Sequence, residues 1–82
     1  MQASILKTAS RVFADPSMLL RKDRVIEGEQ RWYAIGSLRK AVLLVAHVYR
    51  EENENGEENI RIISAREADL RERRVYLEQA AD

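Results

Sequence analysis

Residues 41–50 read AVLLVAHVYR, and this stretch decides the fold. A strand with one solvent-exposed face alternates apolar and polar residues, whereas this one is apolar at both alternating sets of positions. It therefore predicts a strand in the middle of a sheet that is covered on both sides. Its apolar run, residues 41–46, is the longest in the chain and far shorter than the ~20 residues of a membrane span, so we expect no membrane segment.

Strand signals lie on both sides of this central stretch. Residues 23–28 and 30–36 are rich in Val, Ile, Trp and Tyr and are separated by Gly28, which predicts two strands before it. After it, Asn55-Gly56 is typical of a type I′ hairpin, so residues 58–64 are predicted to return antiparallel. A two-residue loop there would place His47 opposite Ser64, on the face away from Arg61.

Two helices are predicted to flank the strands. Apolar residues recur at helical spacing over residues 4–14, and Asp15-Pro16 ends that pattern because a residue before proline avoids the α region. Ser64 and Glu67 form a capping-box pattern that predicts a second helix to about Gln79. The apolar stripe of that helix is narrow and consists of Ala65, Ala68 and Val75, flanked by Tyr76 and Leu77.

The predicted order is helix, four-stranded antiparallel meander and helix, which is an α+β fold in one domain over residues 1–82. Two such small helices are not expected to cover both faces of so apolar a central strand. The sequence thus predicts either a missing element or an associated partner, including self-association through the uncovered sheet face.

Composition narrows the function classes. The 82 residues contain no cysteine, which excludes disulfides and thiolate metal sites and fits a cytoplasmic protein. With one histidine, a zinc site is not expected, and no motif predicts a cofactor. Fourteen basic residues balance fourteen acidic ones, but five glutamates fall within residues 51–58, so the rest of the chain is basic. Arginine presents a planar fork suited to phosphate, although such side chains also serve as an ordinary solvated surface.

These side chains suit RNA cleavage without a metal. Attack of a ribose 2′-hydroxyl on the adjacent phosphate needs a base, an acid and cations around the transition state. His47 titrates near neutrality and is a candidate for proton transfer. A lone histidine on a buried strand is more often structural, here bonded to Ser64, and Trp32 is likewise more often a core residue than a base-stacking platform.

The chain also resembles the BrnT family over roughly residues 10–79. The resemblance rests on six short motifs in order: Phe13-Ala14-Asp15-Pro16, Asp23-Arg24-Val25-Ile26-Glu27-Gly28, Arg31-Trp32 with Ala34-Ile35-Gly36, Val45-Ala46-His47-Val48-Tyr49-Arg50, Ile60-Arg61-Ile62-Ile63-Ser64-Ala65-Arg66, and Arg73-Arg74-x-Tyr76. It implies a RelE-like fold and a ribonuclease toxin of a type II toxin–antitoxin system. The family's first strand and helix have no counterpart ahead of Ala3.

The resemblance also implies site residues and partners. Arg31, Arg66 and Arg74 would hold the scissile phosphate, His47 or Tyr76 would move the proton, and Arg61 would contact the RNA. Further RNA contacts are expected from the residue types alone, at Arg71 and Arg73 on the charged second helix and at Trp32. The partners would be RNA, a BrnA-like ribbon-helix-helix antitoxin and, through that antitoxin, operator DNA. Two alternatives stay open: an inactive truncated toxin that only binds the antitoxin, and a small basic RNA-binding module.

Overall fold

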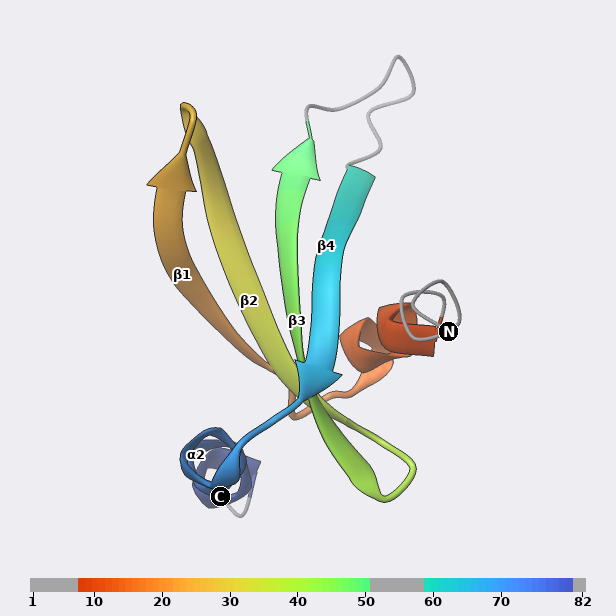
Figure 1. Cartoon of the computed structure of the whole chain (residues 1–82). Coiled ribbons are helices and arrows are strands. Elements are labelled where there is room, and N and C mark those ends of the chain that lie inside the picture. The colour runs from red at the N-terminus through yellow and green to blue at the C-terminus, as the bar shows by residue number, and fades with distance from the viewer. Residues whose placement is uncertain (1–7, 51–58, 81–82) are drawn as a thin grey trace.

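The computed structural model describes residues 8–50 and 59–80. Its elements are the 3₁₀ helix η1 (Ser10–Ala14), the strands β1 (Leu19–Ile26), β2 (Glu29–Leu38), β3 (Ala41–Arg50) and β4 (Asn59–Glu67), and the helix α2 (Leu70–Ala80). The strands pair antiparallel in the order β1-β2-β3-β4 and form one open sheet (Figure 1). The predicted α+β class and four-stranded meander are therefore confirmed.

The central strand has the predicted bounds and the predicted interior position. Val45 and Val48 point to opposite faces of β3, and both side chains are fully buried. Residues 41–49 are all buried or half-buried. The described part of the chain thus shields this strand more completely than its two short helices led us to expect.

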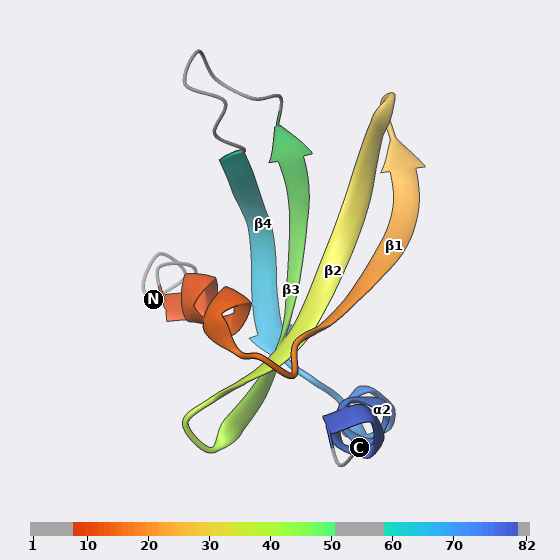
Figure 2. The same ribbon diagram turned by 180° about the vertical axis from the view of Figure 1, so that it is seen from behind.

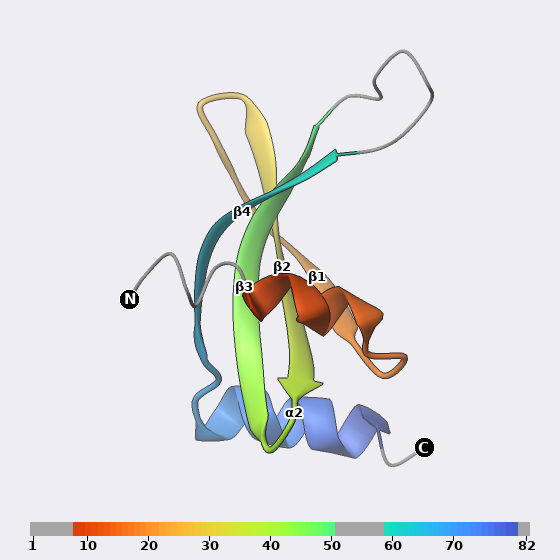
Figure 3. The same cartoon turned by 90° about the vertical axis from the view of Figure 1, so that its right-hand side faces the viewer.

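The two helices pack on opposite faces of the sheet (Figures 2 and 3). On one face, called the η1 face, Ala9 and Val12 pack against Ala34 of β2 and Val45 of β3. On the other, called the α2 face, Tyr76 packs with Leu19, Ile35 and Val42. Because side chains alternate along a strand, these contacts assign every regular strand position to one face.

The predicted bounds of the first two strands were wrong: residues 23–28 start too late and run into the turn, and residues 30–36 are too short at both ends. β1 begins at Leu19, since Leu19 and the residue after it pair with Ile35 and Ala34 of β2. It ends at a two-residue turn in which Glu27 and Gly28 have φ of 51° and 78°. Positive φ at both central positions is the type I′ geometry, whose twist matches that of the flanking strands. β2 then extends to Leu38.

The predicted register of the last hairpin was wrong. His47 pairs with Ile62, and Ser64 pairs with Ala46. Ile63 is an extra residue between these two pairs and forms a β-bulge. Ser64 therefore lies on the face opposite His47 and does not bond it. The Asn55-Gly56 turn lies outside the described residues.

The helix boundaries also differ from the prediction. The described part of the first helix, residues 8–14, is mostly the 3₁₀ turn η1 and ends before Pro16 as expected, while residues 4–7 lie outside the described part. Ser64 does not cap the second helix, because β4 continues to Glu67. Asp69 and Glu72 form the capping box instead: each backbone N–H donates to the other's carboxylate, at 2.8 and 2.9 Å.

The packing stripe of α2 is not the predicted one. Tyr76 is 5% exposed and packs on the sheet, whereas Val75 and Leu77 are 41% and 49% exposed. The helix begins at Leu70, so the predicted stripe residues Ala65 and Ala68 precede it, and Tyr76 is its buried residue in the described part of the chain. Among the described residues, no helix has the length and apolar character needed to cross a membrane.

Candidate functional site

Four arginines share the α2 face of the sheet. Arg21 pairs with Tyr33, and Arg66 pairs with Leu44. The partners Tyr33 and Leu44 belong to the apolar cluster around Tyr76 on this face. Arg31 precedes Trp32, which pairs with His47 on the η1 face, so Arg31 points to the α2 face. Arg61 pairs with Val48, which also points there. We call Arg21, Arg31, Arg61 and Arg66 the arginine face.

The bulge at Ile63 completes this set. Arg61 and Arg66 would lie on opposite faces of a regular strand, because they are five positions apart and side chains alternate with a period of two. The extra residue at Ile63 shifts the alternation by one, so both side chains reach the α2 face. One bulged residue therefore brings Arg61 and Arg66 to the same face, whereas regular alternation along the strand would put them on opposite faces.

Two of these arginines already have carboxylate partners. Arg66 donates to both carboxylate oxygens of Glu72, each at 2.8 Å, and Arg61 Nη2 lies 3.3 Å from Glu29 Oε1. The hydrogen bond with Arg66 is the largest cause of the lowered pKa of Glu72, and it also raises the pKa of Arg66. Arg31 differs, since its Nε is buried with no hydrogen-bond partner within the described part of the chain.

His47 lies on the opposite face from all four arginines. Its side chain is fully buried, and its ring makes edge contacts with Phe13 at 4.9 Å and Tyr49 at 5.3 Å between centroids. Burial lowers its pKa, which the Nδ1 contact with the Val45 carbonyl at 3.2 Å only partly offsets. The imidazole is therefore neutral at physiological pH and does not meet the arginine face.

Tyr76 takes part in a hydrogen-bonded cluster between distant segments. Its hydroxyl donates to Asp15 Oδ2 at 2.5 Å and lies 3.2 Å from Ser37 Oγ. The same carboxylate accepts the backbone N–H groups of Ser17 and Ser37, both at 2.9 Å. Burial raises the pKa of Asp15, but these hydrogen bonds outweigh it and the net pKa is lowered, while burial and the Asp15 bond raise the pKa of Tyr76. This cluster fastens η1, β2 and α2 together.

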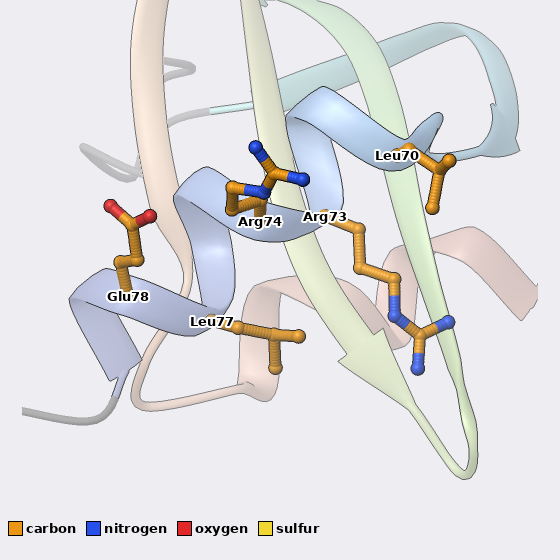
Figure 4. Close-up of a pocket in the computed structure, with 5 residues that line it drawn as sticks. All are labelled: Leu70, Arg73, Arg74, Leu77 and Glu78. Atoms are coloured by element: carbon orange, nitrogen blue, oxygen red, sulfur yellow. The ribbon is translucent and has the colours of Figure 1, made fainter.

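The other predicted arginines lie on α2 and not on the sheet. Arg73 and Arg74 line an open groove of about 450 Å³ with Leu70, Leu77 and Glu78. Figure 4 shows Arg73 projecting from the helix between the two leucines. Arg71 is exposed on the same helix. These three therefore lie on a different element from the scissile-phosphate candidates Arg31 and Arg66, although Arg66 bonds Glu72 in the first turn of α2.

Trp32 points to the η1 face, away from Arg31. Its ring makes an edge contact with Tyr49 at 5.6 Å between centroids, and Lys22 Nζ lies 5.7 Å from the ring centroid. Trp32 is half-buried, so part of the ring remains accessible. The aromatic residue and the arginines thus form two separate surfaces.

The site residues predicted from the sequence did not include Arg21, Tyr33 or Glu72. Alternation along residues 19–35 would have placed Arg21 and Tyr33 with Arg31, had the first strand been predicted to begin at Leu19. Asp69 and Glu72 have the spacing of a capping box, but Ser64 and Glu67 have the same spacing and were chosen for the prediction.

A comparison with protein families now adds to this geometry. Residues 5–72 match the model described as "Ribonuclease toxin, BrnT, of type II toxin-antitoxin system". The chain belongs to the BrnT family. A comparison with curated proteins finds no match.

The extent of the match bears on the site. It includes all four strands of this BrnT chain and the whole arginine face, and it ends in the first turn of α2. Arg73, Arg74 and Tyr76 lie beyond it, although they contributed a motif to the resemblance. Membership of a type II toxin–antitoxin family implies an antitoxin partner.

Proposed function

We propose that this chain is a metal-independent endoribonuclease with a single RelE-like domain, acting on RNA in the cytoplasm. The observation that carries this proposal is the convergence of Arg21, Arg31, Arg61 and Arg66 on one sheet face. An RNA strand laid across the strands of this face would meet guanidinium groups from β1, β2 and β4. Bidentate donors of this kind suit phosphate oxygens.

The proposed reaction is attack of a 2′-hydroxyl on the adjacent phosphate. The P–O bond to the 2′-oxygen forms as the bond to the 5′-oxygen breaks, leaving a 2′,3′-cyclic phosphate and a 5′-hydroxyl. The phosphate gains negative charge in the transition state, and fixed cations stabilise it there more than in the ground state. Arg31 is best suited to this role because its buried Nε is not spent on a partner in the described part of the chain.

We assign proton transfer to Tyr33 in place of His47 and Tyr76. Tyr33 lies on the arginine face, paired with Arg21 and two residues from Arg31. His47 is buried on the other side of the sheet, and the Tyr76 hydroxyl is held by Asp15, which favours structural roles for both. Arg71, Arg73 and Arg74 would add positive potential that attracts RNA without touching the reacting phosphate.

A second candidate function is antitoxin binding without cleavage. It is favoured by the two residues first assigned to proton transfer, since His47 lies on the other side of the sheet and the Tyr76 hydroxyl is held by Asp15. The ion pairs of Arg61 and Arg66 also occupy two of the four guanidinium groups. In either case we propose a BrnA-like ribbon-helix-helix antitoxin that offers acidic side chains to the arginine face and contacts operator DNA itself.

RNA cleavage by the purified chain in EDTA separates the two functions. The nuclease predicts products with 2′,3′-cyclic phosphate ends, together with growth arrest when the chain is expressed without an antitoxin. Tyr33→Phe should lower cleavage by about 10²- to 10⁴-fold while RNA affinity stays within about twofold. Cleavage that disappears in EDTA and returns with Mg²⁺ would refute the mechanism. Intact RNA and normal growth, with antitoxin still bound, would establish the second function.

A further inference from the structure

A second concave site lies at the β1–β2 turn, outside the arginine face. It has a volume of about 740 Å³ and is lined by Lys22, Gly28, Glu29, Gln30, Trp32 and Tyr49. Trp32 and Tyr49 come from neighbouring strands and supply aromatic surface. Lys22, Glu29 and Gln30 are polar or charged, and Gly28 adds only backbone. Neither the family match nor the proposed cleavage chemistry assigns a role to this site.

The aromatic part of the site suits a flat ring. Trp32 and Tyr49 meet edge to face, at 79° between ring planes, so their faces are not stacked on each other. Every nucleobase has a flat π-face that can stack on such an aromatic side chain. Lys22 is exposed, and its ammonium group lies near the Trp32 ring at the end of a flexible side chain. It can therefore contact the phosphate of a nucleotide whose base stacks on Trp32.

The polar part of the site offers acceptors. Gln30 Nε2 donates to the carbonyls of Asp23 at 2.6 Å and Arg31 at 2.8 Å, which uses both of its N–H groups. The side chain of Gln30 therefore has only its carbonyl oxygen to offer, and the ionised carboxylate of Glu29 also only accepts. Guanine carries adjacent N1–H and N2–H donors on one edge, whereas uracil has a single ring N–H on that edge.

Glu29 joins this site to the arginine face. Its Oε1 is the atom that lies 3.3 Å from Arg61 Nη2, and the same residue lines the aromatic site. An RNA strand with a phosphate at Arg61 would therefore lie next to the β1–β2 turn. One of its bases could then cross this turn and reach Trp32. We infer that the site binds a guanine base of the RNA whose phosphates lie on the arginine face, an inference that rests on the proposed function.

The single tryptophan of the chain provides a direct readout. Short 2′-O-methyl RNA oligonucleotides, which lack the attacking hydroxyl, are titrated into the wild-type protein while Trp32 fluorescence and affinity are measured. An oligonucleotide with guanine should quench the fluorescence and bind about tenfold tighter than the same sequence with inosine, which lacks the N2 amino group, or with uracil. No variant is needed for this comparison.

Variants then test the acceptor. Glu29→Gln should reduce the preference for guanine over inosine to about twofold, whereas Glu27→Gln, a matched loss of one carboxylate in the same turn but outside the site, should preserve it. RNA that binds equally with every base and leaves Trp32 unquenched would overturn this inference and leave the proposed nuclease standing.

Two other results also overturn the inference. Quenching of Trp32 by the antitoxin, with no quenching by bound RNA, would assign the site to a protein partner. Absence of both RNA binding and RNA cleavage at low salt would overturn the proposed function, and the base site with it.

Discussion

Arg61 and Arg66 present their guanidinium groups on the same face of the sheet, although they are five residues apart on one strand. The extra residue at Ile63 is the cause, because it reverses the alternation between the two arginines. Bulges commonly redirect side chains near functional sites. Here the bulge brings both arginines of β4 to one side of the proposed phosphate-binding surface. The predictions below test that surface and the contacts that support it.

Loss of one guanidinium from the arginine face should weaken both binding and cleavage. We expect Arg31→Ala to lower RNA cleavage by about 10²-fold, because a preorganised donor to the reacting phosphate is removed. The slope of log affinity against log salt should fall by about one unit. Arg11→Ala, which removes an exposed guanidinium from η1 on the other side of the sheet, is the matched control and should change cleavage less than twofold.

If RNA binds Arg66 as proposed, Glu72 should compete with it, because Glu72 accepts both hydrogen bonds from the guanidinium. Glu72→Gln should tighten RNA binding by about two- to fivefold, the range expected for releasing an exposed ion pair. Glutamine at this position still accepts the Asp69 N–H, so α2 should remain capped and the Tm nearly unchanged. Glu78→Gln removes a carboxylate elsewhere on the same helix and serves as control. Weaker RNA binding by Glu72→Gln would instead mean that Glu72 holds Arg66 in its binding position.

Tyr76 should prove structural. Tyr76→Phe removes the hydroxyl that bonds Asp15, and we expect the free energy of unfolding to fall by about 1–2 kcal/mol, roughly 5–15 °C in Tm. Cleavage per folded molecule, measured well below the Tm, should be unchanged. A 100-fold loss of cleavage at unaltered Tm would place the hydroxyl in the reaction.

Stability should fall in acid in two steps. The pKa of His47 is lowered from 6.5 by burial, so below that pH the unfolded chain binds a proton that the folded chain resists, and stability declines. The pKa of Asp15 is lowered from 3.8, which adds a second decline below that value. The variant His47→Asn has no titrating group at this position. In urea unfolding, its free energy of unfolding should decline less between pH 7 and 5 than that of the wild type, and should still decline below pH 3.8. An equal decline in that range would contradict the assignment to His47.

Gly36 permits the close approach of η1 to β2. A Cβ at this position would lie 2.7 Å from Val12 Cγ1 and 3.3 Å from the Val12 carbonyl oxygen. Gly36→Ala should therefore lower the free energy of unfolding by about 1–3 kcal/mol. Val12→Ala removes the closest atom. It should therefore lower the free energy of unfolding by less in the Gly36→Ala background than in the wild type. Strict additivity of the two changes in urea unfolding would argue against this contact.

Local sequence patterns determined much of the architecture. The apolar run at residues 41–50 identified the central strand with the correct bounds, and Asp15-Pro16 marked the end of the first helix. The order of helix, meander and helix followed from hydrophobic periodicity, and the ordered motifs identified the family that the comparison confirms. The excess of arginine indicated an anionic partner. This excess is a property of the composition alone, so it could be read without the fold.

Only the tertiary structure decided which arginines share a face of the sheet. Face assignment depends on the parity of each strand, and one bulged residue at Ile63 reversed it without any local signal in the sequence. The cluster of Tyr76 with Asp15 joins residues 61 positions apart, and no periodicity encodes such a pairing. Hydrogen-bond partners and shared faces arise when distant segments pack, so the site could be located only after the sheet had been built.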